Sequence, residues 1–278
     1  MKQLSGLAAL AIPAALAILA APLGGCAAAL KDAPPLAELA DAAGPGESPG
    51  TGGLMARAAE LERRRDLEDM RRAAALYLQS AAGGASGWEA LVAAARTEVW
   101  LTDHETDPAL RQEAATRSVQ ASQWCTRVAP EQPDCVYWLG ASLGVQARER
   151  PSTGLSALPR IEASFKDAAS RAPQLDDGGP DRALALLYLR APGWPAGPGD
   201  AELALQHARR AVELSPLHPP NLLALAEALT AAGDGEGSLA AARQALDLAR
   251  AAGGREPDAP DWIREAERAL NGETRLRP

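Results

Sequence analysis

The amino-acid sequence predicts an all-α protein, and its composition and the spacing of its prolines are the main reasons. Hydrophobic residues make up 47% of the 278 residues, yet aromatic residues make up only 4% and a single Phe is present. Most of the apolar residues are Ala and Leu, which favour helices, whereas strands favour β-branched and aromatic side chains. A chain of this length forms one large domain or two small ones.

The formal net charge of −8 argues against one class of partner. Binding to nucleic acid depends on a basic patch that contacts phosphates, and the arginines of this acidic chain are scattered. We therefore expect no nucleic-acid partner and assign the charge to solubility.

Residues 1–25 are typical of a secretory signal peptide. Lys2 precedes a nearly continuous apolar run over 4–23, and the sequence LGGC then ends at Cys26. This pattern resembles a bacterial lipobox and implies that Cys26 is lipidated. The alternative is an uncleaved transmembrane anchor, since about 20 apolar residues can span a bilayer. Pro13 and the Gly-Gly-Cys junction argue against that alternative.

The residue that follows Cys26 is Ala27, which by the sorting rules of bacterial lipoproteins favours the outer membrane, facing the periplasm. Residues 26–53 are rich in Pro, Gly, Ala and Ser, and predict a lipidated flexible tether that could contain a short helix over 35–43. The remaining residues, 54–278, are expected to form one helical domain.

Export also makes the two remaining cysteines informative, because disulfides form in oxidising compartments. Cys125 and Cys135 lie five residues before and five after Pro130. If Pro130 lies in the turn of a helical hairpin, the two cysteines face each other, and we predict a disulfide. The alternative is two separate buried thiols. A catalytic redox pair is not expected, since the CxxC spacing is absent.

Internal repetition is the next signal. Pro130, Pro173 and Pro216 follow one another at intervals of 43 residues, and each ends a helical segment. Each proline is followed by a polar turn and then by an apolar helix. The expected first helices are 134–149, 181–190 and 220–231, and the expected second helices are 154–171, 200–214 and 235–251.

This arrangement resembles the tetratricopeptide repeat, a pair of antiparallel helices in about 34 residues. The stretch ARRAVELSP over 208–216 is close to the usual end of a repeat, and longer turns at 150–154, 174–180 and 191–199 supply the extra length. Helices are also expected within 54–82 and over 87–102, 107–129 and 257–270, the last as a polar cap. The prediction is an α-solenoid of about four hairpins with a concave face.

Side chains suited to catalysis do not form a recognisable pattern. His104, His207 and His218 have no partner at metal-ligand spacing, and none of the common catalytic or phosphate-binding motifs is present. The charged stretch ELERRRDLEDMRR over 60–72 is interpreted as a solvated helix face. We expect neither an enzyme, nor a cofactor, nor a metal site.

Residues 173–231 are similar to a known family. The segment PQLDDGGPDR over 173–182, Tyr188, the segment PGWP over 192–195, and the later segments AVEL and NLLALAE carry the resemblance. They resemble the T component of tripartite ATP-independent periplasmic (TRAP) transporters, the TatT family. The resemblance implies a lipoprotein of degenerate tetratricopeptide hairpins that works beside a periplasmic solute-binding subunit.

Two functions remain open from the sequence. In the first, the protein is a transporter accessory that binds the solute-binding subunit and also a small apolar ligand, in a cavity lined by apolar residues near the 191–199 loop. In the second, it is an envelope scaffold for protein–protein contacts in outer-membrane assembly or secretion, with self-association left open.

The residues expected to contact a ligand or partner are Arg182, Tyr188, Trp194 and Asn221. The alternative for Trp194 is a structural one, in which its side chain plugs the end of the hairpin stack. In either case Pro192 and Pro195 are expected to hold Trp194 in a stiff loop.

Overall fold

The computed structural model describes residues 32–44, 51–84 and 87–272, so the predicted signal peptide and Cys26 lie outside the described residues. The described residues form twelve α-helices and one short 3₁₀ helix, and they contain no β-strand. The predicted all-α class is confirmed. None of these helices combines the length and the hydrophobicity needed to cross a bilayer.

Ten of the helices pair into five antiparallel hairpins, one more than the sequence suggested. The pairs are α2 (Thr51–Glu62) with α3 (Leu67–Ala82), α4 (Gly87–His104) with α5 (Pro108–Val128), α6 (Pro133–Glu149) with α7 (Pro151–Arg171), α8 (Gly179–Arg190) with α9 (Ala201–Leu214), and α10 (Pro219–Ala231) with α11 (Gly235–Ala252). The short helix α1 (Leu36–Ala42) packs on α3, and α12 (Ala259–Leu270) packs on α11 after the 3₁₀ turn η1 (Gly253–Arg255).

Aspartates mark several helix starts. The side chains of Asp66, Asp107, Asp200 and Asp234 each accept a hydrogen bond from a backbone N–H in the first turn of the helix that follows. Those N–H groups have no partner within the helix, so a carboxylate there satisfies a donor and also faces the positive end of the helix dipole. Prolines occupy the first turn of six helices, where their missing N–H costs little.

The structure moves two of the expected boundaries. The predicted turn at 150–154 does not form, because α7 begins at Pro151 and continues through Pro159. The helical body also starts earlier than residue 54, since α1 buries Leu39 and Ala40 within the segment expected to be a tether.

Small side chains let the helices approach closely. The ring of Phe165 on α7 lies so near Gly140 on α6 that a Cβ at residue 140 would come within 2.7 Å of its Cε1 atom. Alanines fill much of the remaining core, and the first helices of successive hairpins also touch, α4 against α6 and α8 against α10, with α10 against α12. This stacking produces one continuous helical body.

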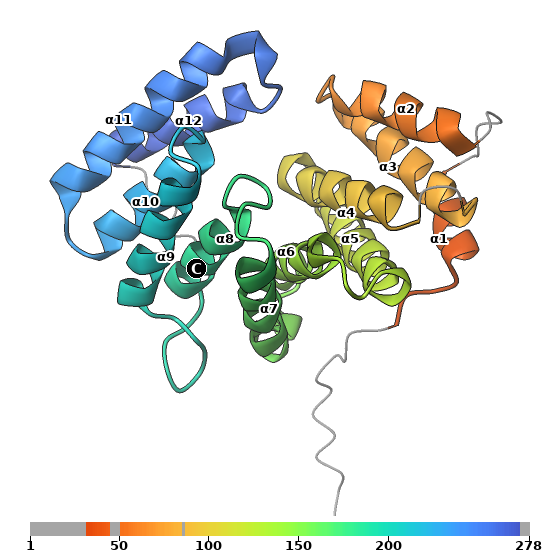
Figure 1. Ribbon diagram of the computed structural model, residues 1–278, viewed down its shortest axis with the longest axis horizontal. Helices are drawn as coiled ribbons and strands as arrows, with labels where there is room; N and C mark the ends of the chain where they lie inside the picture. The colour runs from red at the N-terminus through yellow and green to blue at the C-terminus, as the bar shows by residue number, and fades with distance from the viewer. Residues whose placement is uncertain (1–31, 45–50, 85–86, 273–278) are drawn as a thin grey trace, which may run out of the picture.

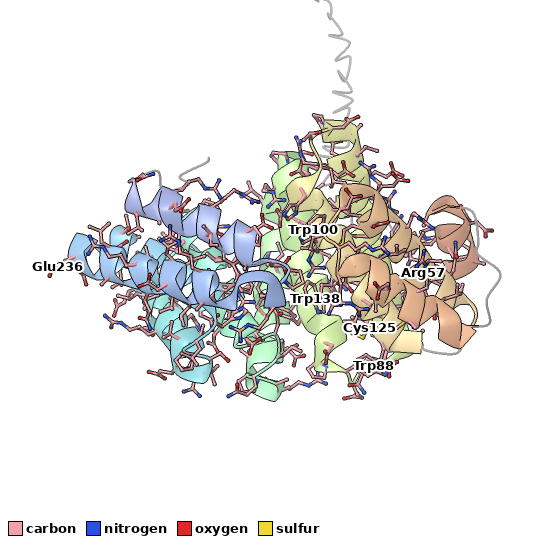
Figure 2. All side chains as sticks on the ribbon, turned by 90° about the horizontal axis from the view of Figure 1, so that it is seen from above. Arg57, Trp88, Trp100, Cys125, Trp138 and Glu236 are labelled. Atoms are coloured by element: carbon pink, nitrogen blue, oxygen red, sulfur yellow. A yellow bond between two sulfur atoms is a disulfide. The ribbon has the colours of Figure 1, made fainter. Side chains whose placement is uncertain are left out.

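The hairpins follow a curved path that brings the two ends of the body toward each other. In Figure 1 the turn between α11 and α12 points toward the turn between α2 and α3, across the inner side of the curve. Seen from above in Figure 2, Trp100 and Trp138 lie in the middle of the molecule and Glu236 lies at its outer edge. The curvature therefore makes neighbours of segments that are far apart in the sequence.

Candidate functional site

A cavity of about 460 Å³ lies where the two ends of the superhelix meet. The N-terminal hairpins supply Glu62, Arg63, Arg65 and Arg96. The middle of the chain supplies Asp176, Asp177, Arg182, His218 and Pro220. The C-terminal cap supplies Glu256, Pro257, Asp258 and Trp262. Nine of these thirteen side chains are Asp, Glu or Arg, so the cavity is polar.

The N-terminal wall comes from the charged stretch 60–72, where most charged side chains are exposed as expected, whereas Glu62 is buried and Arg65 is half-buried. The stretch breaks into the end of α2, a turn and the start of α3. Glu62 is only 8% exposed, and its carboxylate accepts hydrogen bonds from the hydroxyl of Tyr77 at 2.7 Å and from Arg96 at 3.0 Å. Arg65 occupies the turn with φ of +51°, a left-handed conformation that is uncommon for a residue with a side chain.

Arg65 joins the two ends of the body. Its Nε and Nη2 atoms donate to the two carboxylate oxygens of Asp258, at 2.6 and 2.9 Å, while its Nη1 donates to the carbonyl of Glu62 at 2.9 Å. Its guanidinium also lies over the ring of Trp100, 5.9 Å from the centroid. Bidentate pairs of this kind fix orientation as well as distance. We call the contact between Arg65 and Asp258 the clasp.

His104 reinforces the clasp. The imidazole stacks on Trp100 at 3.7 Å between centroids, and its Nε2 lies 2.9 Å from a carboxylate oxygen of Asp261 on α12. Asp107, three residues after His104, caps α5.

The floor of the cavity depends on an unusual turn before α8. Asp176 and Asp177 have φ of +50° and +55°, and Gly178 follows at +80°. These two aspartates and Arg65 are the non-glycine residues with positive φ in the described part of the chain, and all three line this cavity. Such conformations persist only where the surroundings enforce them, and they are concentrated at functional sites.

A chain of hydrogen bonds crosses the floor from α6 to α10. The hydroxyl of Tyr137 donates to Asp176 at 2.7 Å, and Arg182 donates to the same oxygen at 2.6 Å and to the side-chain oxygen of Asn221 at 2.8 Å. Burial, and next the negative charge of Asp176, raise the pKa of Tyr137 well above its ordinary value. The hydroxyl therefore remains protonated and continues to donate.

Asn221 was expected to contact a ligand, and the structure gives it a different position. Its side chain is fully buried, and its amide group donates to the backbone carbonyls of Asp177, Ala211 and Ser215 at 2.8, 2.9 and 3.1 Å. Asn221 therefore ties the left-handed turn to the end of α9. It supports the cavity from behind through Arg182.

Tyr188 and Trp194 do not join Arg182 at the cavity. Tyr188 is buried, and its hydroxyl donates to Glu162 at 2.9 Å. Trp194 is 90% exposed, so the interpretation of this side chain as a plug is wrong. The 191–199 loop is nevertheless ordered by backbone hydrogen bonds, from Gly199 to Pro192 and from Asp200 to Tyr188.

His218 adds a titratable group to the floor. Burial lowers its pKa, and the nearby Arg182 lowers it further. The imidazole is therefore neutral at neutral pH. Its ring lies 5.5 Å from that of Trp262, and its Nδ1 atom lies 3.8 Å from a carboxylate oxygen of Asp177.

The residues that form the two walls of the cavity were not identified from the sequence. Glu62 and Arg65 looked like ordinary members of a charged helix, and Asp258 looked like part of a polar cap. No local signal joins residues so distant in the chain. Among the described residues, no three His, Cys, Asp or Glu side chains are grouped to hold a metal ion.

The other predicted pair of side chains lies outside the cavity. Cys125 at the end of α5 and Cys135 at the start of α6 form a disulfide across the turn that contains Pro130, with their Cα atoms 5.2 Å apart. This agrees with the predicted pairing.

Comparison with known proteins supports the fold. No family model matches the sequence, and no curated protein matches it either. A thermophilic tetratricopeptide-repeat protein of Thermus thermophilus aligns in structure with a TM-score of 0.59 and 18% identity, covering 80% of this chain and all of that one. Yeast Tom70 aligns with a TM-score of 0.30 and 12% identity, over 84% of this chain and 67% of that one. The fold is a tetratricopeptide-like α-solenoid.

Proposed function

We propose that this protein is a non-enzymatic binding module that holds a short segment of a partner protein in the cavity beside the clasp. The observation that carries the proposal is the cavity itself, which draws its lining from both ends and the middle of a curved helical stack. Stacked helical hairpins commonly use their concave face for binding. The left-handed conformations of Arg65, Asp176 and Asp177 at this one place support the same assignment.

The size and the lining of the cavity favour a peptide segment. A volume of about 460 Å³ falls within the range of about 300–1,000 Å³ typical of ligand sites, and it admits a few side chains but not a folded domain. Ionisable side chains dominate the walls, and an apolar ligand would leave them without hydrogen-bond partners in place of water. The cavity therefore supports the protein-binding role more than the binding of a small apolar molecule.

The more specific role that we propose is that of a TatT-like accessory of a TRAP transporter, with a periplasmic solute-binding subunit as the partner. The support is the resemblance over 173–231, since the segment DDGGPDR of that resemblance includes Asp176, Asp177 and Arg182 of the cavity floor. An outer-membrane assembly or secretion scaffold is the alternative, because a charged cavity suits either kind of partner.

A capture experiment tests this role and separates the two alternatives. The full-length chain would be purified with its interacting proteins from a detergent-solubilised envelope, beside the variants Arg63→Trp, which places a bulky uncharged side chain in the cavity wall, and Arg210→Trp, the same change outside it. Arg63 is an exposed residue of the cavity wall, and Arg210 is an exposed residue of α9 outside the lining. We expect a solute-binding subunit with the wild type and the Arg210 variant, and a clear loss with the Arg63 variant.

Each other outcome has a definite meaning. Envelope-assembly or secretion proteins in place of the solute-binding subunit would remove the transporter role and leave the scaffold role. Capture that is unaffected by Arg63→Trp would contradict binding in the cavity.

We also propose that Cys26 carries a lipid anchor, which places the protein at the periplasmic face of the outer membrane. The support is the LGGC sequence that ends the apolar run. Cys26→Ala should abolish metabolic labelling with a fatty acid and release the chain from the membrane fraction. Retention in membranes without labelling would indicate a transmembrane anchor instead.

A further inference from the structure

We propose that the cavity recognises a positively charged side chain, Lys or Arg, of the partner segment, between the carboxylates of Asp177 and Glu256 and the indole of Trp262. This inference rests on the proposed binding role and specifies the chemistry of the partner. It depends on which charges of the cavity already have partners inside the protein and which do not.

The arginines of the cavity are already paired with carboxylates. Arg65 is held by Asp258 in the clasp, and Arg96 contacts Glu62 through two nitrogens at 3.0 and 3.2 Å. Arg182 contacts Asp176 at 2.6 Å. These guanidinium groups face neighbouring anions, so little of their positive charge is left for a ligand.

Arg63, the fourth arginine, pairs with Glu60, which does not line the cavity. The four positive charges of the cavity are therefore all paired with carboxylates of the protein.

Two carboxylates are left over. Glu256 is half-buried, and its carboxylate forms no hydrogen bond or ion pair with the described residues; it acts on Arg65 only through longer-range electrostatics. Asp177 meets Ser215 at 3.5 Å and the neutral His218 at 3.8 Å. Three of the five carboxylates of the lining pair with Arg65, Arg96 and Arg182, and Arg63 pairs outside the lining, so two carboxylates have no close cation.

An aromatic ring lines the same cavity as these carboxylates. Trp262 lines the same cavity and contacts the ring of His218, which in turn adjoins Asp177. A cation over an indole ring gains about 0.5–2 kcal/mol, and nearby carboxylates add attraction of the same sign. An anionic side chain at this place would instead meet two carboxylates that have no close counter-charge.

Peptides that differ at one residue provide the test. The full-length chain in detergent would be titrated into three peptides that carry an uncharged fluorescent label and are identical except for a central Lys, norleucine or Glu, and binding would be followed by fluorescence anisotropy at low salt. We expect the Lys peptide to bind about tenfold more tightly than the norleucine peptide, and the Glu peptide to bind most weakly.

Protein variants connect this selectivity to the three residues. The double variant Asp177→Asn and Glu256→Gln should remove most of the preference for the Lys peptide over the norleucine peptide, and Trp262→Leu should weaken binding of the Lys peptide several-fold. Asn tolerates the left-handed backbone at residue 177, so the fold is retained. Glu213→Gln, an exposed change on α9, is the matched control and should leave all three affinities unchanged.

Equal affinities for the Lys and norleucine peptides would overturn the inference and leave the proposed binding role intact. Tightest binding of the Glu peptide would overturn it in favour of the arginines. If none of the peptides binds although capture of a partner still depends on Arg63, the inference fails and the proposed function stands. If capture is also independent of Arg63, both fail.

Discussion

Arg65 and Asp258 are 193 residues apart in the chain, and their side chains form a two-point hydrogen-bonded ion pair. Arg65 lies in the first hairpin and Asp258 immediately before the last helix, so the pair connects the two ends of the helical stack. A tetratricopeptide-like array is open in principle, because each repeat needs only its neighbours. Here one ion pair with its neighbours draws the array into a closed curve around a cavity.

Removing the clasp should open the curve. Asp258→Asn keeps the shape of the side chain but leaves the guanidinium of Arg65 without its counter-charge, and we expect a loss of about 1–2 kcal/mol in the free energy of unfolding. The radius of gyration from small-angle X-ray scattering should increase. Glu213→Gln removes an exposed ion pair of Arg210 and should change neither quantity. A variant at residue 258 with an unchanged radius of gyration would contradict the role assigned to the clasp.

The contact between α6 and α7 should tolerate no side chain at residue 140. Gly140→Val would push atoms into the ring of Phe165, and we expect a loss of about 1–3 kcal/mol, measured by urea unfolding. Gly144 is one turn further along α6, and a Cβ there would have no atom within 4 Å. Gly144→Ala should therefore stabilise the protein by about 0.5–1 kcal/mol. Similar effects of the two changes would mean that helix propensity, not packing, decides both.

Asn221 should contribute to stability although it was expected to contact a ligand. Asn221→Ala removes one acceptor of Arg182, the donor to the carbonyl of Asp177 and a second donor to the carbonyls of Ala211 and Ser215, and we expect a loss of about 2–3 kcal/mol. Asn271, exposed after α12, is the control, and its change to Ala should cost less than about 0.5 kcal/mol. Thermal and urea unfolding of both variants would measure the difference.

His218 should make stability depend on pH in mildly acidic solution. Burial and then Arg182 lower its pKa below the ordinary value of 6.5, so the unfolded chain binds the proton more readily than the folded protein does. The contribution of the neutral His218 side chain to the free energy of unfolding is complete above pH 6.5 and is lost as the pH falls through the folded-state pKa. The nearby Asp177 and Asp176 oppose this shift without reversing it.

Urea unfolding at about pH 7.5 and about pH 5.5, on either side of the ordinary histidine pKa, measures this effect. His218→Gln should lose less stability than the wild type between the two values, because glutamine does not titrate. The same loss in both proteins would assign the pH dependence to other groups.

The disulfide should stabilise the turn between α5 and α6. Replacing both Cys125 and Cys135 with Ala opens a short loop in the unfolded chain, and the chain-entropy model gives a loss of about 2–3 kcal/mol. A reductant should lower the melting temperature of the wild type toward that of the variant. The reductant should leave the variant itself unchanged.

Local chemistry explains which parts of the fold could be predicted. The starts of α5 and α9 lie within a residue or two of the predicted positions because Asp107 and Asp200 act through hydrogen bonds to adjacent residues. Local chemistry did not predict the start of α7 correctly, because a proline can either end a helix or occupy its first turn. Pro151 occupies the first turn of α7, where a turn over 150–154 was predicted.

The cavity could not be predicted in the same way, because it depends on the curvature of the whole stack. Arg182 was selected for its place in the family resemblance, and it does line the cavity. Nothing near Arg65 or Asp258 in the sequence identifies either as the partner of the other. The alternative in which Trp194 plugs the hairpin stack is wrong, because its side chain is exposed, and the expectation that Trp194 contacts a partner stays a prediction.

The closed curve has a consequence for how the chain folds. Contacts in an open array are local, so folding can begin in any repeat and spread to its neighbours. The clasp joins residues 193 positions apart, and the contact between His104 and Asp261 joins residues 157 positions apart. The entropic cost of closing a loop increases with its length. These contacts should therefore form late. A nascent chain would have most of its hairpins before it had its cavity, and the cavity would be completed only after α12 had left the ribosome.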